Sequence, residues 1–272
     1  MSDNFALSGL PTLQSTQVFG RTIRYYDVGR GTPLVLVHGV GGDADQWAFV
    51  YGPLAAKHRI IALDLLGFGR SDKPSIDYCV EGYVEFLDRF LTKLGVDRAA
   101  LLGHSFGGWI VASFALAFPQ RVDRLVLVDA AGIDAGSIPM PVDLNVSTRR
   151  NMRDVFEFMF HDPRMVSDGL VDLAYGLHLD RCDGPTIKSA LATINDPREK
   201  LDGKLGALAM PTLLLWGEND RLTPLSMAHE FRNAIPNAEL EVVPRCGHLP
   251  LIENPAAFSK AVLGFLARWF RA

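Results

Sequence analysis

The chain has 272 residues, a length compatible with a single α/β domain that carries an insertion. Apolar residues make up 48% of the sequence and charged residues 21%, values typical of a globular protein with a well-filled core. Lys and Arg total 27 against 31 for Asp and Glu, and no basic run could neutralise several adjacent phosphates. Nucleic acid is therefore not expected as a partner.

The sequence shows no targeting or membrane segment. Its start lacks a basic stretch followed by an apolar one, and no apolar run reaches the length that spans a bilayer. We therefore expect a cytoplasmic protein without a membrane partner. Cys79, Cys182 and Cys246 are too few and too scattered for a disulfide framework or a metal site, and we interpret them as reduced, buried thiols.

Short aliphatic segments alternate with amphipathic ones along the chain. Segments 16–19 and 22–28 alternate like two antiparallel strands joined at Gly20-Arg21. Six further runs suit strands that are buried on both faces of a sheet. These runs are 34–37, 60–63, 99–102, 125–128, 212–216 and 240–243. The alternation predicts an α/β fold with an eight-stranded, mostly parallel sheet and helices on both faces.

Helical patterns fill several of the intervals between these strands. Apolar residues recur at helical spacing over 80–94, and Gly95 follows as a C-cap. An apolar helix is expected over 109–118, directly after a strand candidate and its turn. Pro255 opens the last helix of the chain.

The segment 133–208 interrupts this alternation. It separates two strand candidates and carries helical, Met- and Phe-rich patterning in place of a strand. We interpret it as a helical cap inserted into a core formed by residues 1–132 and 209–272. Phe156 and Met159 are expected either to form the interior of the cap or to contact substrate.

The hexapeptide GHSFGG at 103–108 lies between a strand candidate and a helix. A serine on such a sharp turn, here Ser105, is lifted above the sheet, and glycines are needed beside it because side chains would collide there. The helix that follows presents unpaired N–H groups, and the N–H of Phe106 could stabilise an oxyanion. The alternative is that Ser105 only caps the helix.

A second oxyanion donor is expected from the loop VHGVGG at 37–42. Its glycines, Gly39 among them, allow the backbone to approach a ligand closely, and the N–H of Val40 is the candidate donor. His38 is interpreted as a structural residue of this loop. Trp47 is expected either to contact substrate or to pack in the interior.

A serine hydroxyl is a weak nucleophile at neutral pH and needs a neighbouring base. On a fold of this kind the acid and then the histidine follow the serine along the chain. His248 lies in a loop after a strand candidate, whereas His229 lies inside a predicted helix. We therefore predict that His248 is the general base.

The base in turn needs an anionic partner that fixes its tautomer. Asp220 follows the strand candidate 212–216 within the sequence WGEND, at the sheet edge where His248 is also expected. We predict that Asp220 orients His248. Asp129, at the end of another strand candidate, is the alternative acid, and Glu218 is a weaker third.

These motifs resemble those of the α/β-hydrolase family, over nearly the whole chain outside the cap. The matching motifs are LVHG at 36–39, DLLGFGRSD at 64–72, GHSFGG at 103–108, GEND at 217–220 and CGH at 246–248. Leu66 stands where a proline is usual. Haloalkane dehalogenases and epoxide hydrolases of this family carry an aspartate where this chain has Ser105, so both activities are disfavoured.

The cap stretch 148–163 is similar to the lid of family members that hydrolyse carbon-carbon bonds in products of aromatic ring opening. In that comparison Arg181 would bind a substrate carboxylate. Those enzymes commonly place an asparagine before the serine and a tryptophan after the histidine. This chain has His104 and Leu249 there, and both residues are expected beside the substrate.

We therefore predict a serine hydrolase that cleaves a carboxylic ester or related acyl compound through an acyl-enzyme, without a metal or organic cofactor. Hydrolysis of a carbon-carbon bond in 2-hydroxy-6-oxo-dienoates is the close alternative. A ligand receptor on the same fold is a further one. The expected partner is a small acyl substrate, and the oligomeric state is open, with a homodimer among the options.

Overall fold

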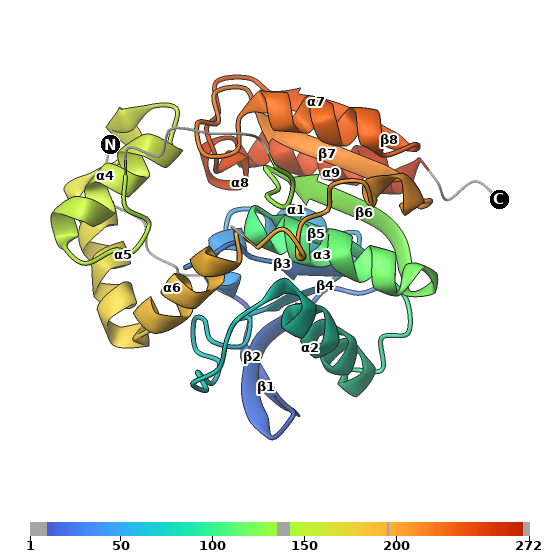
Figure 1. Cartoon of the computed structure of the whole chain (residues 1–272), viewed down its shortest axis with the longest axis horizontal. Coiled ribbons are helices and arrows are strands. Elements are labelled where there is room, and N and C mark those ends of the chain that lie inside the picture. Colours follow the sequence, from blue (N-terminus) through green and yellow to red (C-terminus); the bar gives the residue numbers. More distant parts are fainter. Residues whose placement is uncertain (1–9, 135–141, 195, 269–272) are drawn as a thin grey trace.

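An eight-stranded sheet forms the centre of the computed structural model, which describes residues 10–134, 142–194 and 196–268 (Figure 1). The strands are β1 (Leu13–Val18), β2 (Arg21–Val28), β3 (Pro33–Val37), β4 (Arg59–Leu63), β5 (Ala99–His104), β6 (Val122–Val128), β7 (Thr212–Gly217) and β8 (Ala238–Val243). Their order in the sheet is β1-β2-β4-β3-β5-β6-β7-β8. The pairs β1/β2 and β2/β4 are antiparallel and the others parallel, so the predicted α/β fold is confirmed.

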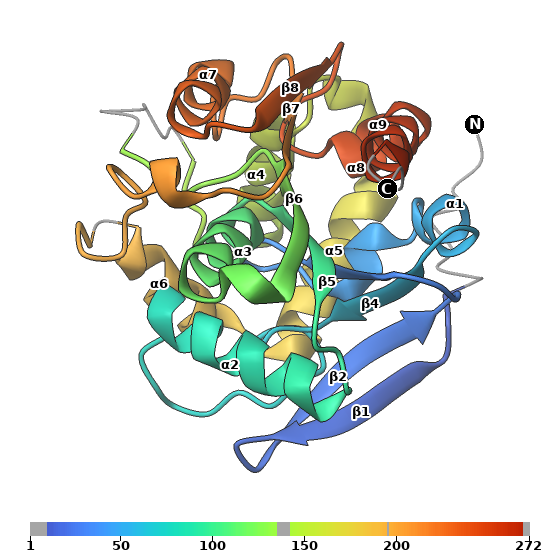
Figure 2. The same cartoon turned by 90° about the vertical axis from the view of Figure 1, so that its right-hand side faces the viewer.

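Helices cover both faces of the sheet (Figure 2). One face packs against α2 (Val80–Lys93), α3 (Phe106–Ala117) and α7 (Leu225–Ala234). The other face packs against α1 (Tyr51–Ala55), α8 (Pro250–Glu253) and α9 (Pro255–Ala267). Val35 and Val37 of β3 point into the first core, whereas Leu34 and Leu36 point into the second. This two-sided burial explains why the central strands are apolar without alternation.

The first hairpin differs from the prediction by one residue. Val18 pairs with Arg21, so the two-residue turn is Phe19-Gly20 and not Gly20-Arg21. Both turn residues have positive φ angles, 50° and 71°, as a hairpin turn that follows the twist of its strands requires. Of the two, only Gly20 is a residue type that signals this conformation, which is why the turn was misplaced from the sequence.

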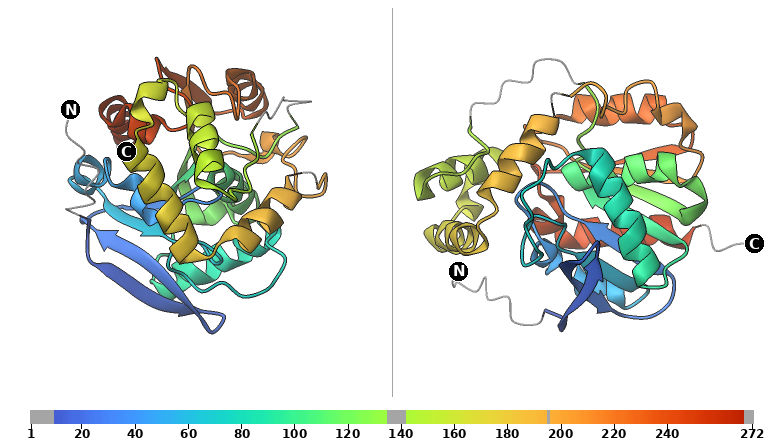
Figure 3. Two further views of the ribbon diagram at one scale, coloured as in Figure 1. Left: turned by 90° about the vertical axis from the view of Figure 1, so that its left-hand side faces the viewer. Right: turned by 60° about the horizontal axis from the view of Figure 1, so that its bottom comes forward.

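The described residues between β6 and β7 include three α-helices: α4 (Arg149–Met159), α5 (Asp168–Arg181) and α6 (Gly184–Thr193). Figure 3 shows these cap helices gathered on one side of the molecule, beside the sheet and not against its faces. A small apolar cluster that includes Met152, Phe160 and Val171 joins the cap to Leu249 of the core. The cap boundaries predicted at 133 and 208 fall in the connections between β6 and β7.

The described helices and cysteines add two findings. None of these helices combines the length and the apolar character needed to cross a membrane. All three cysteines are free, but only Cys246 is fully buried. Cys182 is exposed because it caps the end of α5 in a left-handed conformation, so its predicted burial was wrong.

Gly107 provides a test of the packing between α3 and β3. A Cβ atom at this position would lie 2.2 Å from the carbonyl oxygen of Val37. We expect Gly107→Ala to lower the free energy of unfolding by about 1–3 kcal/mol, because backbone must move to admit the methyl group. Urea unfolding measures this change.

Gly264→Ala is the matched control, because Gly264 lies in helix α9 and a Cβ atom added there would meet no atom within 4 Å. At this position alanine should raise stability by roughly 0.5–1 kcal/mol through its better helix propensity. Equal effects of the two substitutions would contradict the close approach of the chain at Gly107.

Candidate active site

Ser105 stands on a sharp turn between β5 and α3. Its φ of 54° and ψ of −119° lie outside the helical and extended regions. The turn is fixed from both sides, since the Ser105 N–H donates to the carbonyl of Val128 at 2.9 Å and its carbonyl accepts from Ala131 N–H at 3.1 Å. The Ser105 side chain makes no capping hydrogen bond to α3. The alternative that this serine is only a helix cap is therefore not supported.

Glycines make this turn possible. A Cβ atom on Gly103 would lie 2.2 Å from the carbonyl oxygen of Gly107, closer than any real contact. The strand and the helix thus pass each other backbone to backbone, and the serine side chain is left facing the end of the sheet.

His248 lies in the loop after β8 and is paired with Asp220 from the loop after β7. Its Nδ1 is 2.7 Å from Asp220 Oδ2, and both side chains are buried. Because Nδ1–H donates to the carboxylate, the Nε2 of a neutral ring is left with its lone pair. An imidazole held in this way can accept a proton from a hydroxyl group.

Asp220 is held as a carboxylate by its surroundings. Its Oδ1 accepts from the N–H groups of Leu222 and Thr223 at 2.8 and 3.0 Å, and its Oδ2 accepts from the Thr223 hydroxyl at 2.6 Å. Burial opposes the charge, but His248 and the Thr223 hydrogen bonds outweigh it and hold the pKa of Asp220 below its usual value.

Neither alternative acid pairs with His248, although Asp129 lies beside Asp220. Asp129 does not reach His248, and its Oδ1 instead accepts from the N–H of Gly217 at 2.8 Å. Burial and the charge of Asp220 raise the pKa of Asp129 well above its usual value, which favours its neutral, protonated form. Glu218 accepts from the backbone of Arg245 at the surface. The geometry therefore pairs His248 with Asp220 among the three predicted acids.

The two predicted oxyanion donors flank Ser105. A Cβ atom on Gly39 would lie 3.1 Å from Ser105 Cβ, so the loop that contains Val40 runs directly beside the serine. Within the described residues, the N–H groups of Val40 and Phe106 have no acceptor. His38 uses both ring nitrogens inside the protein, toward Gly39 O at 2.7 Å and Leu65 N at 3.0 Å, which fits its predicted structural role.

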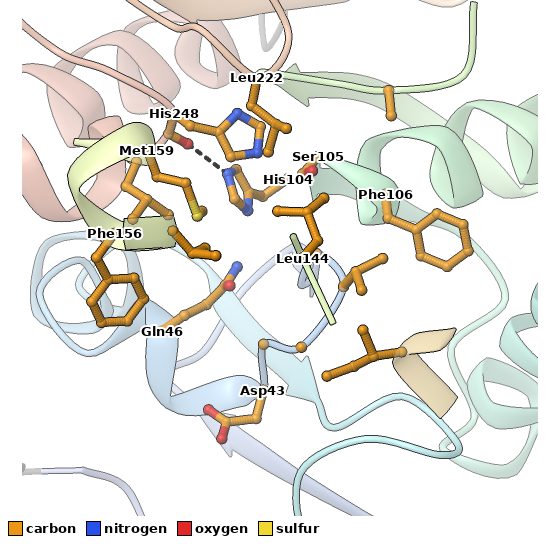
Figure 4. A pocket seen from close by; sticks show the side chains of 18 of the residues that line it. Asp43, Gln46, His104, Ser105, Phe106, Leu144, Phe156, Met159, Leu222 and His248 are labelled. Carbon is orange, nitrogen blue, oxygen red and sulfur yellow. Dashed lines mark hydrogen bonds between the residues drawn. The ribbon is translucent and has the colours of Figure 1, made fainter. Parts of the chain in front are cut away.

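A pocket of about 740 Å³ opens beside Ser105 and His248 (Figure 4). It lies between the carboxyl end of the sheet and the cap helices, and most of its wall is apolar. Six of these apolar residues are Leu144, Val155, Phe156, Met159, Leu177 and Ile187.

The pocket brings together most of the residues predicted to contact substrate. Gly39, His104, Phe156, Met159, Arg181 and Leu249 all line it. Trp47 does not line it, because its ring is fully buried and packs near Phe258 on the far face of the sheet. The predicted substrate contact of Trp47 was therefore wrong, and its alternative role in the interior holds.

One wall of the pocket is charged. The Arg181 guanidinium contacts the carboxylate of Asp43 and lies 3.5 Å from that of Asp45. Asp43 is buried and also caps η1 (Ala44–Trp47), since its Oδ1 accepts from the N–H of Asp45 at 2.8 Å. These two acids were not predicted from the sequence, although they closely follow the glycine loop that carries Val40.

The serine turn after β5 and the histidine-aspartate pair beyond β7 and β8 together define a hydrolase of the α/β type. The family model for the alpha/beta hydrolase fold matches residues 32–164 and 174–255. The chain therefore belongs to the α/β-hydrolase family and is an enzyme of the hydrolase class.

Three relatives illustrate the range of this family. A 2-hydroxy-6-oxo-2,4-heptadienoate hydrolase of Pseudomonas putida is 36% identical, over 89% of this chain and 91% of its own. The structure of a membrane phospholipase A, described as a bacterial virulence factor, is 30% identical with a TM-score of 0.86, over 96% of this chain and 86% of its own. A meta-cleavage product hydrolase from Pseudomonas fluorescens is 28% identical with a TM-score of 0.81, over 93% of this chain and 97% of its own.

The two buried aspartates allow a matched test of their roles. Asp220→Asn should lower kcat by about 10⁴-fold, because the amide can hold His248 in the wrong tautomer. Asp129→Asn should leave kcat within about threefold, because Asp129 does not contact His248 and a neutral amide resembles its protonated carboxyl. Comparable losses of activity in both variants would contradict the assignment of the acid.

Asp129 also predicts a pH dependence of stability. The folded protein holds the Asp129 proton to a higher pH than the unfolded chain, which loses it near the ordinary pKa of 3.8. Stability therefore falls as the pH rises from about 4. Asp129→Asn removes this loss, so its stability relative to wild type should be greater at pH 8 than at pH 5, by about 1 kcal/mol or more. Urea unfolding at both pH values measures the difference, and a constant difference would contradict the buried, protonated state.

Proposed function

We propose that this enzyme hydrolyses carboxylic esters with an apolar acyl chain, through an acyl-enzyme on Ser105. The Ser105 hydroxyl attacks the ester carbonyl while His248 Nε2 takes its proton, and Asp220 stabilises the imidazolium that forms. The N–H groups of Val40 and Phe106 hold the oxyanion. Collapse of this intermediate expels the alcohol, which receives the proton from His248.

The second half of the reaction repeats these steps with water. His248 removes a proton from a water molecule, which attacks the acyl carbonyl and releases the carboxylic acid. The Ser105 oxygen takes the proton back and the enzyme is restored. The scheme uses only groups of this chain and the substrate.

The ester assignment rests mainly on the ion pairs that Arg181 already makes. Its guanidinium lines the pocket, but the carboxylates of Asp43 and Asp45 already neutralise it. A substrate carboxylate would have to displace Asp43 and leave it as a buried, unpaired charge, whereas Asp45 also pairs with Arg70 at 2.8 Å. The rest of the pocket is mainly apolar, and such a wall favours an uncharged acyl chain. Similarity to a phospholipase A supports ester chemistry.

Hydrolysis of a carbon-carbon bond is the second candidate. It is favoured by the 36% identity to a 2-hydroxy-6-oxo-2,4-heptadienoate hydrolase and by the presence of Arg181 in the pocket. The two candidates share the nucleophile and the base. They differ in whether the pocket accepts an anionic substrate.

Substitution of the nucleophile tests the shared chemistry. Ser105→Ala should lower the kcat for 4-nitrophenyl butanoate by about 10⁴-fold or more, because no other group can form the acyl-enzyme. Ser113→Ala, on the helix that follows and outside the pocket, is the matched control and should retain wild-type turnover. Unchanged hydrolysis by the Ser105 variant would contradict the proposal. A wild-type enzyme that stops after one turnover would favour the ligand receptor.

Asp43→Asn tests the role of the charged wall. Asparagine keeps the oxygen that caps η1 but removes the charge that neutralises Arg181. The kcat/KM for a 2-hydroxy-6-oxo-dienoate should therefore rise by about tenfold relative to that for 4-nitrophenyl butanoate. Asp180→Asn, at the exposed neighbour of Arg181, is the control for net charge. If the wild-type enzyme already prefers the dienoate by orders of magnitude, the ester assignment is wrong.

A further inference from the structure

His104, the residue before the nucleophile, has a fixed tautomer. Its Nε2 is 2.8 Å from the backbone carbonyl oxygen of His248. A carbonyl can only accept, so Nε2 carries the hydrogen and Nδ1 of the neutral ring carries the lone pair. Burial and the neighbouring His248 lower the pKa of His104 to about 3, which keeps the ring neutral at physiological pH. Nδ1 of His104 is therefore a hydrogen-bond acceptor.

This acceptor has no partner among the described residues. His104 is only 3% exposed, and its Nδ1 is buried without a hydrogen bond. Buried polar atoms in folded proteins are almost always hydrogen-bonded, so an exception beside a catalytic serine calls for an explanation.

A second unpartnered atom lies on the facing wall of the pocket. The Nε2 of Gln46, on η1, is also buried without a hydrogen bond in the described part of the chain. Figure 4 shows the Gln46 amide directed toward the ring of His104. An amide nitrogen only donates, so the two walls offer one donor and one acceptor to the same region of the pocket.

The position of Gly39 places this pair close to the reacting carbonyl. A Cβ atom on Gly39 would lie 3.1 Å from Ser105 Cβ and 3.3 Å from His104 Nδ1. The backbone at Gly39 thus lies against both the nucleophile and the acceptor, which places His104 Nδ1 near Ser105. A group that reaches Nδ1 belongs to the part of the substrate next to the scissile bond.

We propose that His104 Nδ1 and Gln46 Nε2 form a subsite for a hydroxyl group carried by the substrate next to its scissile ester. A hydroxyl both donates and accepts, so it donates its hydrogen to His104 Nδ1 while its oxygen accepts from Gln46 Nε2. A methylene or methyl group in the same place satisfies neither atom. This subsite rests on the proposed ester hydrolysis and defines the substrate class more narrowly, as hydroxy esters.

The hydroxyl can belong to either half of the ester, and two matched pairs of substrates distinguish these cases. Ethyl 3-hydroxybutanoate against ethyl butanoate tests the acyl side. The alcohol side is tested with 2-hydroxyethyl butanoate against propyl butanoate. A pH-stat gives kcat/KM for all four esters. We expect the hydroxy ester of one pair to be preferred by about tenfold or more, the effect of about one well-formed hydrogen bond.

Gln46→Leu and Gln46→Glu assign this preference to the subsite. Leucine removes the donor, and glutamate keeps the size of the side chain but presents only acceptors. In both variants the ratio of kcat/KM within the preferred pair should fall toward one. If Gln46 had only a structural role, its substitution would lower kcat/KM equally for both esters of the pair and leave their ratio unchanged. That result would overturn the proposal.

Measurements on the wild-type enzyme distinguish failure of the hydroxyl subsite from failure of the proposed ester hydrolysis. If it hydrolyses all four esters but shows no preference above about threefold in either pair, the hydroxyl subsite is wrong and the ester hydrolase stands. If the wild-type enzyme hydrolyses neither these four esters nor 4-nitrophenyl butanoate, the proposed function itself fails.

Discussion

The site depends on backbone segments that approach each other more closely than side chains would allow. Gly103 and Gly107 let β5 and α3 meet at the serine turn. Gly217 likewise lets the end of β7 lie against the His248 loop, because a Cβ atom there would lie 1.9 Å from the carbonyl oxygen of Gly247. The contact at Gly217 brings the Asp220 loop against the His248 loop, where Asp220 and His248 form their 2.7 Å hydrogen bond. The positions of Ser105, His248 and Asp220 thus follow from where the chain lacks side chains.

The sequence predicted most of this arrangement because the relevant signals are local. Apolar runs located the parallel strands, and the residues that follow strands at one sheet edge located Ser105, His248 and Asp220. The sequence favoured Asp220 but left Asp129 open, since both follow a strand, and the structure pairs Asp220 with His248 and Asp129 with the N–H of Gly217. The role of Trp47 was also ambiguous, because residue spacing does not reveal on which face of the sheet a loop residue packs.

The pocket was the part that the sequence described least. Its charged wall pairs Arg181 of the cap with Asp43 of the core, residues far apart along the chain, and no periodic pattern links them. The unpartnered atoms of His104 and Gln46 are likewise visible only once their surroundings are known. Fold and catalytic chemistry are therefore encoded in short motifs, whereas specificity is encoded in contacts between distant segments.

The cap is joined to the His248 loop as well as to the pocket. The N–H of His248 donates to the carbonyl of Met159 at 2.7 Å, and Arg221 donates to the carbonyls of Glu157 and Phe160. The end of α4 therefore supports the loop that holds His248. Lifting this end as a lid would break the contact that positions the base. Ion pairs from Arg149 and Arg153 to Asp168 join α4 to α5, so both of these cap helices are connected to the His248 loop through α4.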